Sequence, residues 1–276
     1  MKHVRWNTTY FKEGHMQEIV QDIAEKAQGV FLWVFLVTRS LRDGLTNGDT
    51  ILDFQKRLRG LPPDLERFFK LMLDAIDPLY HEKMARLLQI AANGKRPLQF
   101  LLYCMHESEY EDKDYALKHI TNPLSFTEVE TLHDQCQRRI NARCGGLLLI
   151  RNRRVEFLHR TVRDFLLTRE MSEYLPTKSG SDFLVNLSTF RGYVCLLKSH
   201  KAFLGTDTLA EAFEYAANSL DESLGSIIVL LNAIEDTFSG FINGPNTDYF
   251  DFGNLDSDYF LSEEATFRND PVNLLI

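Results

Sequence analysis

The stretch Phe157-Leu158-His159-Arg160-Thr161-Val162-Arg163-Asp164-Phe165-Leu166 places one histidine between a short apolar strand and an amphipathic helix. Two apolar runs, 145–150 and 155–158, flank the polar residues 151–154, and this pattern predicts a β-hairpin. Ahead of the hairpin, Ser125 and Glu128 form a capping box at the start of a predicted helix over 126–143. The predicted order is therefore helix, two-stranded wing and helix, which is typical of a winged helix.

Apolar residues at helical spacing predict further helices on both sides of this unit. They cover residues 13–28, 30–43, 49–58, 63–76, 80–92, 98–105, 160–168, 182–198, 208–218 and 223–237. Gly29 and Gly44 are expected to end the first two of these helices, since glycine tolerates the left-handed backbone that follows a helix. The polar segment 107–118 is expected to be a surface excursion, and 170–181 is expected to be a linker.

The predicted fold class is mainly α, with a helical bundle, a winged-helix domain that carries a small β-hairpin wing, and a second helical domain. The predicted divisions are a remnant of an upstream domain (1–14), a first helical domain (15–78), the winged-helix domain (79–170), the start of a second helical domain (171–242) and an acidic, poorly patterned tail (243–276). With 276 residues and 44% hydrophobic content, the chain is long enough to bury such cores.

Five motifs in sequence order resemble the fungal NACHT-type NTPases, which belong to the STAND class and are relatives of the NLR immune receptors. They are Gly29-Val30-Phe31-Leu32-Trp33-Val34, Leu61-Pro62-Pro63-Asp64-Leu65-Glu66, the run from Met72 to Pro78, Arg143-Cys144-Gly145-Gly146-Leu147-Leu148 and Phe157-Leu158-His159-Arg160-Thr161. The resemblance covers about residues 19–198 and the part of the family that follows the nucleotide-binding domain. It implies the regulatory arm of a signalling protein that closes around ADP and rearranges to oligomerise.

A phosphate-binding loop of the form G-x-x-x-x-G-K-[ST] does not occur in this sequence. The pair Gly94-Lys95 is followed by Arg96 and lacks the glycine five residues earlier that lets backbone N–H groups converge on a phosphate. The sequence also lacks the G-x-S-x-G and H-E-x-x-H motifs of hydrolases. No catalytic residue, no enzyme activity and no cofactor are expected of the chain alone. ADP or ATP is expected only when a NACHT domain, in the same chain or in another, completes it.

His159 is the candidate binding residue. In the family that the chain resembles, the histidine at this position reaches the β-phosphate of ADP, so the resemblance implies a sensor of the bound nucleotide. The alternative from the residues themselves is a histidine that caps the following helix or packs under the wing. Sequence alone leaves the two roles equally weighted.

Arginines gather around the predicted wing, and the region 138–170 has nine arginines, three acidic residues and no lysine, for a local net charge of +6. The arginines nearest the wing are Arg151, Arg153, Arg154, Arg160 and Arg163. A basic wing can bind nucleic-acid phosphates, but Glu128, Glu130 and Asp134 in the preceding helix oppose this use. Contact with a protein partner or another domain is therefore favoured. The tail 243–276, with a net charge of −6, is a possible electrostatic counterpart of this region.

Four cysteines, Cys104, Cys136, Cys144 and Cys195, match no disulfide or zinc framework and are expected to be buried free thiols. His133 with Cys136 and Cys144 leaves a zinc site open, although a fourth ligand is missing, and no metal is expected. The aromatic residues Phe31, Trp33 and Phe35, with Phe68 and Phe69, are expected to pack inside the first helical domain.

The longest apolar run has eight residues, at 30–37, far fewer than the roughly 20 that cross a bilayer. The start of the chain lacks the apolar core of a secretion signal. A cytoplasmic protein without membrane contact is expected, with a NACHT domain and further copies of the chain as partners and no nucleic acid. The alternatives to a regulatory arm are a winged-helix nucleic-acid-binding protein and a decayed fragment that acts only as an interaction scaffold.

Overall fold

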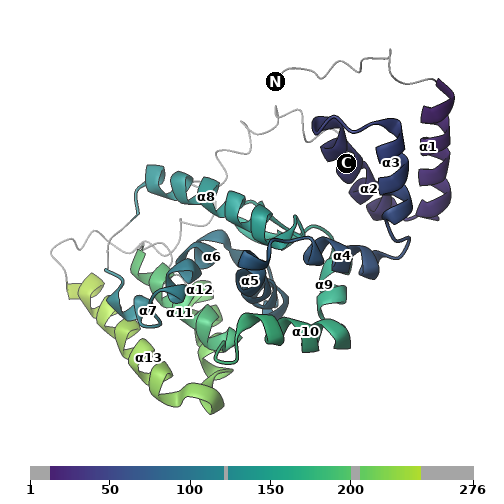
Figure 1. Cartoon of the computed structure of the whole chain (residues 1–276). Helices are drawn as coiled ribbons and strands as arrows, with labels where there is room; N and C mark the ends of the chain where they lie inside the picture. The colour runs from purple at the N-terminus through teal and green to yellow at the C-terminus, as the bar shows by residue number, and fades with distance from the viewer. Residues whose placement is uncertain (1–12, 121–123, 200–205, 244–276) are drawn as a thin grey trace.

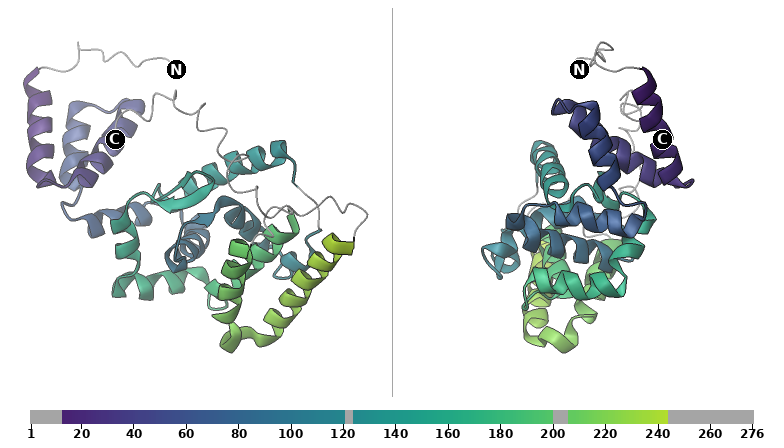
Figure 2. Two further views of the ribbon diagram at one scale, coloured as in Figure 1. Left: turned by 180° about the vertical axis from the view of Figure 1, so that it is seen from behind. Right: turned by 45° about the vertical axis from the view of Figure 1, so that its right-hand side comes forward.

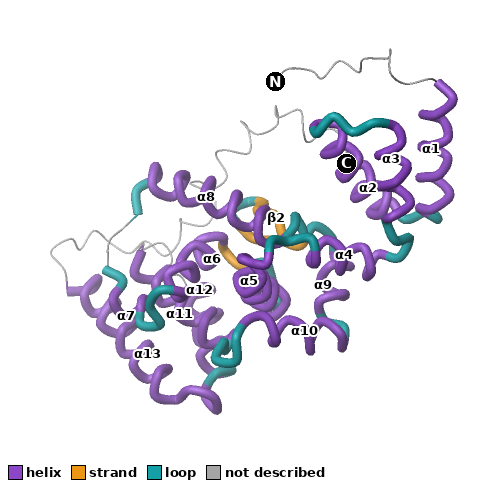
Figure 3. The backbone as a smooth tube through the Cα atoms, viewed as in Figure 1, coloured by secondary structure: helices purple, strands orange, loops and turns teal. Residues whose placement is uncertain are grey.

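The computed structural model describes residues 13–120, 124–199 and 206–243, and these are mainly helical (Figure 1). The expected remnant 1–14 lies outside the described residues apart from its last two positions, and the acidic tail 243–276 lies outside them apart from Asn243. One small three-stranded sheet occurs in the described part of the chain, and Figure 3 shows it beside α8 and α9.

Helices α1 (Glu13–Ala27), α2 (Phe31–Thr46) and α3 (Ile51–Gly60) form a bundle at one end of the molecule (Figure 1). The buried residues of this bundle are apolar: Trp33, Leu36 and Val37 of α2 pack with Phe54 and Leu58 of α3. The expected stop at Gly29 is present, because α1 ends at Ala27 and Gly29 has a φ of 82°. Helix α4 (Leu65–Asp74) then leads to the rest of the molecule.

The expected packing of the aromatic residues is right for some positions and wrong for others. Trp33, Phe68 and Phe69 are buried, and Trp33 Nε1 donates to the carbonyl oxygen of Pro62 at 2.7 Å. Phe31 and Phe35, however, are 88% and 49% exposed. They lie on the outer side of α2, because its single buried face is already occupied by Trp33 and its neighbours, and a continuous apolar run does not require burial on every side of a helix.

The expected helix stop at Gly44 is also wrong, since α2 continues to Thr46. A Cβ at position 44 would overlap the Asp49 carboxylate, which forms an ion pair with Arg57 of α3. Gly44 therefore permits a close approach between the end of α2 and the loop before α3. The left-handed residue in this turn is Gly48, with a φ of 80°.

The central part of the chain alternates helices with short strands. Its elements are η2 (Pro78–Tyr80), α5 (His81–Asn93), β1 (Leu98–Gln99), α6 (Phe100–His106), η3 (Glu107–Tyr110), α7 (Tyr115–Lys118), α8 (Phe126–Cys144), β2 (Leu148–Arg151) and β3 (Arg154–Phe157). The predicted capping box at Ser125 and Glu128 opens α8. The predicted helix over 98–105 begins two residues late, because Leu98 and Gln99 instead pair with Val155 and Arg154 as an edge strand.

The predicted hairpin is present in the sheet, whose strand order is β1-β3-β2 with antiparallel neighbours. Its two-residue turn consists of Asn152 and Arg153, whose φ angles of 47° and 58° are those of a type I′ turn. The hairpin packs on α8, and Leu148 and Val155 point into the core. Helix α8 ends at Gly145 in the left-handed conformation.

Five helices complete the described chain: α9 (Arg160–Leu166), α10 (Arg169–Ser179), α11 (Val185–Ser199), α12 (Thr206–Ala217) and α13 (Leu220–Asn243). The expected linker over 170–181 is wrong, because most of it is α10, which packs along α5 through Met171 and Leu175. Helix α11 is the central helix, buried from Leu187 to Ser199 except at Arg191. Figure 2 places α13 at the end of the molecule opposite α1 in both views.

Candidate functional site

His159 is the residue immediately before α9, and its side chain is exposed. Its backbone is extended, and Nδ1 accepts a hydrogen bond from the Thr161 backbone N–H at 3.3 Å. The Thr161 hydroxyl lies 3.0 Å from the same nitrogen. The expected capping role of His159 is therefore present in the structure. Because Nδ1 accepts the bond from the backbone N–H, the proton of the neutral ring lies on Nε2, which leaves Nε2–H as the remaining donor of this exposed residue.

The base of the β2–β3 hairpin lies against the first bundle. Gly145 and Gly146 have φ angles of 59° and 79°, and they turn the chain from α8 into β2. A Cβ at Gly146 would overlap the guanidinium of Arg39, which reaches this turn from α2. On the other side of the junction, the rings of Phe69 in α4 and Phe165 in α9 lie 5.5 Å apart. The segment that carries His159 is thus in contact, through its neighbours, with both α2 and α4.

Three of the five wing arginines are used within the fold. Arg153 forms an ion pair with Glu130 of α8 at 2.9 Å, and Arg154 Nη1 donates to the Pro97 carbonyl at 2.9 Å. Arg163 Nη2 donates to the Ala92 carbonyl at 3.4 Å. Arg151 and Arg160 are exposed. The Arg153–Glu130 pair compensates one positive charge, whereas hydrogen bonds to carbonyl oxygens leave the charges of Arg154 and Arg163 in place.

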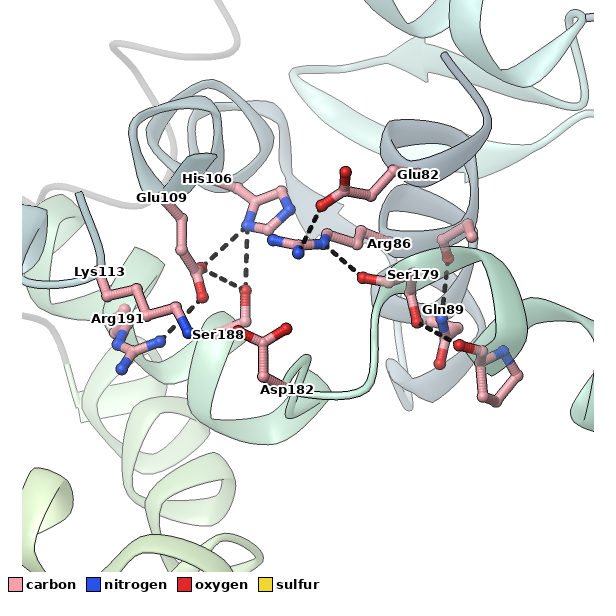
Figure 4. A network of polar contacts seen from close by, with 12 residues as sticks. Glu82, Arg86, Gln89, His106, Glu109, Lys113, Ser179, Asp182, Ser188 and Arg191 are labelled. Atoms are coloured by element: carbon pink, nitrogen blue, oxygen red, sulfur yellow. Dashed lines mark hydrogen bonds and ion pairs between the residues drawn. The ribbon is translucent and has the colours of Figure 1, made fainter. Parts of the chain in front are cut away.

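A buried polar cluster that the sequence did not reveal lies between η3 and α11 (Figure 4). His106, Glu109 and Ser188 are 2%, 7% and 1% exposed. Glu109 accepts hydrogen bonds from the Ser188 hydroxyl at 2.6 Å and from Arg191 Nη1 at 2.8 Å, and its Oε2 lies 3.1 Å from His106 Nδ1. The expected surface excursion over 107–118 is therefore wrong at Glu109 and also at Tyr115, which is 7% exposed.

The charge of Glu109 is stabilised where it lies. Burial by itself would raise the pKa of Glu109, but the contacts from His106, Ser188 and Arg191 outweigh that effect and hold the pKa below its usual value. Burial acts in the same way on the neighbouring Glu107, whose pKa Arg143 and Lys83 nevertheless lower to about 2. Arg143 belongs to one of the five motifs that resemble NACHT-type NTPases. Its ion pair with Glu107 joins the end of α8 to η3.

The cluster does not have the geometry of a nucleophilic relay. In a serine-type triad the hydroxyl and the carboxylate contact opposite nitrogens of the histidine. Here the Ser188 hydroxyl lies 3.0 Å from His106 Nδ1, the same nitrogen that contacts Glu109. His106 Nε2 is buried without a hydrogen-bond partner among the described residues. The arrangement can hold η3 against α11 but cannot pass a proton from Ser188 through the imidazole to Glu109.

A second set of contacts extends this cluster toward α5 and α10 (Figure 4). Arg86 of α5 pairs with Glu82 at 2.6 Å and donates through Nε to the Ser179 carbonyl at 2.9 Å. Its guanidinium also lies over the rings of Tyr110 and Phe183, 4.8 and 5.0 Å from their centroids. Arg86 thereby joins α5, η3 and the end of α10, so these elements are expected to move as one body.

The cysteine and histidine residues do not converge on a metal position. The His133 ring packs edge-on against Phe100 at 5.2 Å, and Cys136 Sγ donates to the Phe100 carbonyl at 3.6 Å. Cys104, Cys136, Cys144 and Cys195 are buried free thiols, as the sequence predicted. Within residues 13–120, 124–199 and 206–243, no three His, Cys, Asp or Glu side chains are grouped so that they could hold a metal ion. In those same ranges, every helix is too short or too polar to cross a bilayer.

Comparison with known proteins gives two similarities for this chain. Residues 75–206 match the family model described as "Domain of unknown function (DUF7791)". Over 143 residues the chain is 30% identical to the vegetative incompatibility protein HET-E-1 of Podospora anserina. The aligned region covers 51% of this chain and 9% of that protein. The chain therefore matches less than a tenth of that relative's length. No solved structure matches.

The matched family segment includes the features of the candidate site except those on α1 to α4, such as Arg39 and Phe69. It starts one residue after α4 and contains the sheet, His159 and the cluster around Glu109. The similarity to a fungal incompatibility protein agrees with the fungal kinship expected from the motifs.

Proposed function

We propose that this chain is the regulatory arm of a fungal NACHT-type signalling protein and works with a nucleotide-binding domain supplied by the same chain or by another. Within it we assign residues 79–170 to a winged-helix domain. The element order α5, β1, α6, α8 and the β2–β3 hairpin supports this assignment, because a winged helix has helix, strand, two helices and a hairpin in that order. The edge position of β1 beside β3 also fits.

The observation that carries the proposal is the state of His159. Its Nδ1 is committed to the cap of α9, so the exposed Nε2–H is the nitrogen that can donate to a ligand. Capping fixes the ring orientation in advance, and a pre-oriented donor loses less entropy when it binds. In the proposed function this donor contacts a phosphate oxygen of ADP that a separate domain holds. The capping and sensing roles thus use different nitrogens and are compatible.

Helix α2 supports the same proposal from the other side of the junction. Phe31 and Phe35 face outward, and exposed aromatic side chains of this size are typical of protein contact surfaces. Arg39, further along the same helix, touches the Gly145–Gly146 turn at the base of the wing. A nucleotide-binding domain seated on Phe31 and Phe35 would therefore be connected through one rigid helix to the segment that carries the sensor.

The arginines of the wing favour a protein-binding role over nucleic-acid binding. Arg153 is already paired with Glu130 on the helix that would enter a DNA groove, so both the charge and the position of that helix oppose groove binding. The chain has no phosphate-binding loop of its own, and we propose that it controls a nucleotide state without hydrolysing the nucleotide. The similarity to a vegetative incompatibility protein supports a signalling role in fungal incompatibility.

The experiment joins this chain to the nucleotide-binding domain of a fungal NACHT protein and measures the affinity for ADP by calorimetry. His159→Asn keeps an oxygen acceptor for the cap of α9, since asparagine is among the best N-cap residues, but it removes the Nε2–H donor. We expect the affinity for ADP to fall about ten- to a hundredfold, the loss of one charge-assisted hydrogen bond. The oligomeric fraction should rise at the same ADP concentration.

The melting temperature of the unfused chain separates the two roles of His159. His159→Ala removes both the cap and the donor, so it should lower the melting temperature of the isolated chain, whereas His159→Asn should not. An unchanged ADP affinity in the asparagine variant would mean that His159 is only a cap, and the sensor proposal would then be wrong.

A further inference from the structure

The last helix of the described chain has an apolar face that nothing in the described residues covers. Helix α13 buries Ile227, Leu230 and Ile234 against the rest of the molecule. Leu224 and Ile228 lie on a different side of the helix and are 55% and 49% exposed. Burying the exposed part of such side chains would stabilise a complex, because it removes apolar area from water. Their exposure one turn apart is therefore a costly arrangement unless a partner covers them.

The spacing of this face is that of a helix-docking seam. The backbone of Ser223 is non-helical, with φ −157° and ψ 53°, so the regular part of α13 begins at Leu224. From there Leu224, Ile228, half-buried Leu231 and Glu235 follow at intervals of four, three and four residues. Residues at these intervals lie on one side of an α-helix, and the alternation of three and four is the pattern by which helices pack side by side.

The charged residues of α12 and α13 themselves have a single sign, while Lys113 and Arg191 lie against α13 beside Gly225, Ser226 and Val229. Residues 206–243, which comprise α12 and α13, contain seven aspartate and glutamate residues and no lysine or arginine. Glu211 and Glu214 of α12 are paired with Arg96 and Lys95. On α13, Glu235 and Asp236 are exposed at the far end of the seam. A helix that lies along Leu224 and Ile228 would therefore meet negative charge as it passes Glu235.

The negative charge of α12 and α13 distinguishes between the segments that could cover the Leu224–Ile228 face. The segment 244–276 is joined to α13 and long enough to reach back along it, but seven acidic residues and one arginine give it a net charge of −6. A second copy of α13 would present the same acidic residues. Like charges at this spacing repel, so both occupants are disfavoured. We propose that the Leu224–Ile228 face of α13 docks a basic amphipathic helix of a partner protein.

The test uses the full chain and two fluorescent 18-residue peptides. Both have leucine along one helical face, and all remaining positions are lysine in one peptide and glutamate in the other. We expect the lysine peptide to bind and the glutamate peptide to bind at least about tenfold more weakly. The double variant Leu224→Ser with Ile228→Ser should weaken binding of the lysine peptide by roughly thirtyfold, because two apolar contacts are lost. Glu235→Gln with Asp236→Asn should reduce both the affinity and its salt dependence.

Leu52→Ser is the matched control, since Leu52 is an equally exposed leucine, at 66%, on α3 of the distant bundle. It should leave binding of the lysine peptide unchanged. Equal binding of the two peptides, or binding that the α13 variants do not weaken, would overturn the proposal. A synthetic peptide of residues 244–276 that binds more tightly than the lysine peptide, and loses affinity in the Leu224 and Ile228 variant, would also overturn it by naming the chain's own tail as the occupant.

Discussion

The bundle of α1 to α3 and the contact between η3 and α11 are built on different principles. The bundle buries Trp33, Leu36, Val37, Phe54 and Leu58, and none of its charged side chains whose burial the structure describes is buried. The η3–α11 contact buries Glu109 and His106 together with Ser188. Apolar burial is non-directional, whereas a buried carboxylate is stable only with its partners in place. The first region is thus stabilised by the apolar surface that it buries, and the second also depends on correctly placed hydrogen bonds and ion pairs.

The difference has a consequence for function. In the bundle, apolar side chains that the core does not need, such as Phe31 and Phe35, remain on the surface and are available for contact with another domain. In the second region each polar group fixes a neighbouring element, since Glu109 joins η3 to α11 and Arg86 joins α5 to the end of α10. The second region is suited to act as a rigid body, and the bundle is suited to receive a partner.

The largest expected effect separates the two sides of α2. Trp33→Ala should lower the free energy of unfolding by about 4 to 5 kcal/mol, because it removes a fully buried aromatic ring and the hydrogen bond to Pro62. Phe31→Ala, on the exposed side, should change it by no more than about 0.5 kcal/mol. Urea unfolding followed by circular dichroism measures both. Similar losses in the two variants would show that α2 is buried on both sides.

The next effect tests the region that depends on geometry. Glu109→Ala leaves Arg191, Ser188 and His106 without their common acceptor and should destabilise the chain by about 3 to 5 kcal/mol, the usual result when one partner of a buried ion pair is removed. Glu109→Gln keeps an acceptor oxygen and should cost less. Glu111→Ala, two residues along and exposed, is the control. A small loss in Glu109→Ala, measured by the same urea titration, would mean that packing alone holds η3 on α11.

The smallest of the three effects depends on pH and involves Glu107. Its pKa is lowered from 4.5 to about 2 in the folded chain, where the carboxylate pairs with Arg143 and Lys83. A lowered folded-state pKa stabilises the chain above the unfolded value, and this contribution is lost as the pH falls from about 4.5 to about 2. At about 1.4 kcal/mol per pKa unit the upper limit is about 3.5 kcal/mol, and because the Glu107 side chain is partly exposed, solvent screening should reduce the contribution to about 1 to 2 kcal/mol.

Glu107→Gln gives the corresponding measurement. The stability difference between this variant and the natural chain should be largest at pH 7 and should shrink below pH 4.5, when unfolding by urea is compared at pH 7, 4 and 3. In the bundle, Trp33→Ala should show a difference that is independent of pH over the same range. A constant difference for Glu107→Gln would show that the carboxylate charge does not contribute.

Signals that lie within a few residues of one another predicted the local structure well. Ser125 and Glu128 predicted the start of α8, and polar residues between two apolar runs predicted the β2–β3 hairpin. The helix α10 was missed because Pro176 and several polar residues make 170–181 look like a linker, while its short apolar face, formed by Met171 and Leu175, packs on α5. An apolar face of two residues is too short to distinguish a helix from a linker in the sequence alone.

The sequence by itself determined the capping box of α8, the position of the β2–β3 hairpin, the burial of Trp33 and the lack of a phosphate-binding loop. These depend on neighbouring residues or on composition. Only the tertiary structure decided that Phe31 and Phe35 are exposed and that Glu109 is buried. Ser188 and Arg191 lie 79 and 82 residues from Glu109 in the chain. Burial and pairing of this kind arise when segments far apart in the chain come into contact. A local sequence pattern does not indicate which side chains will meet in such a contact.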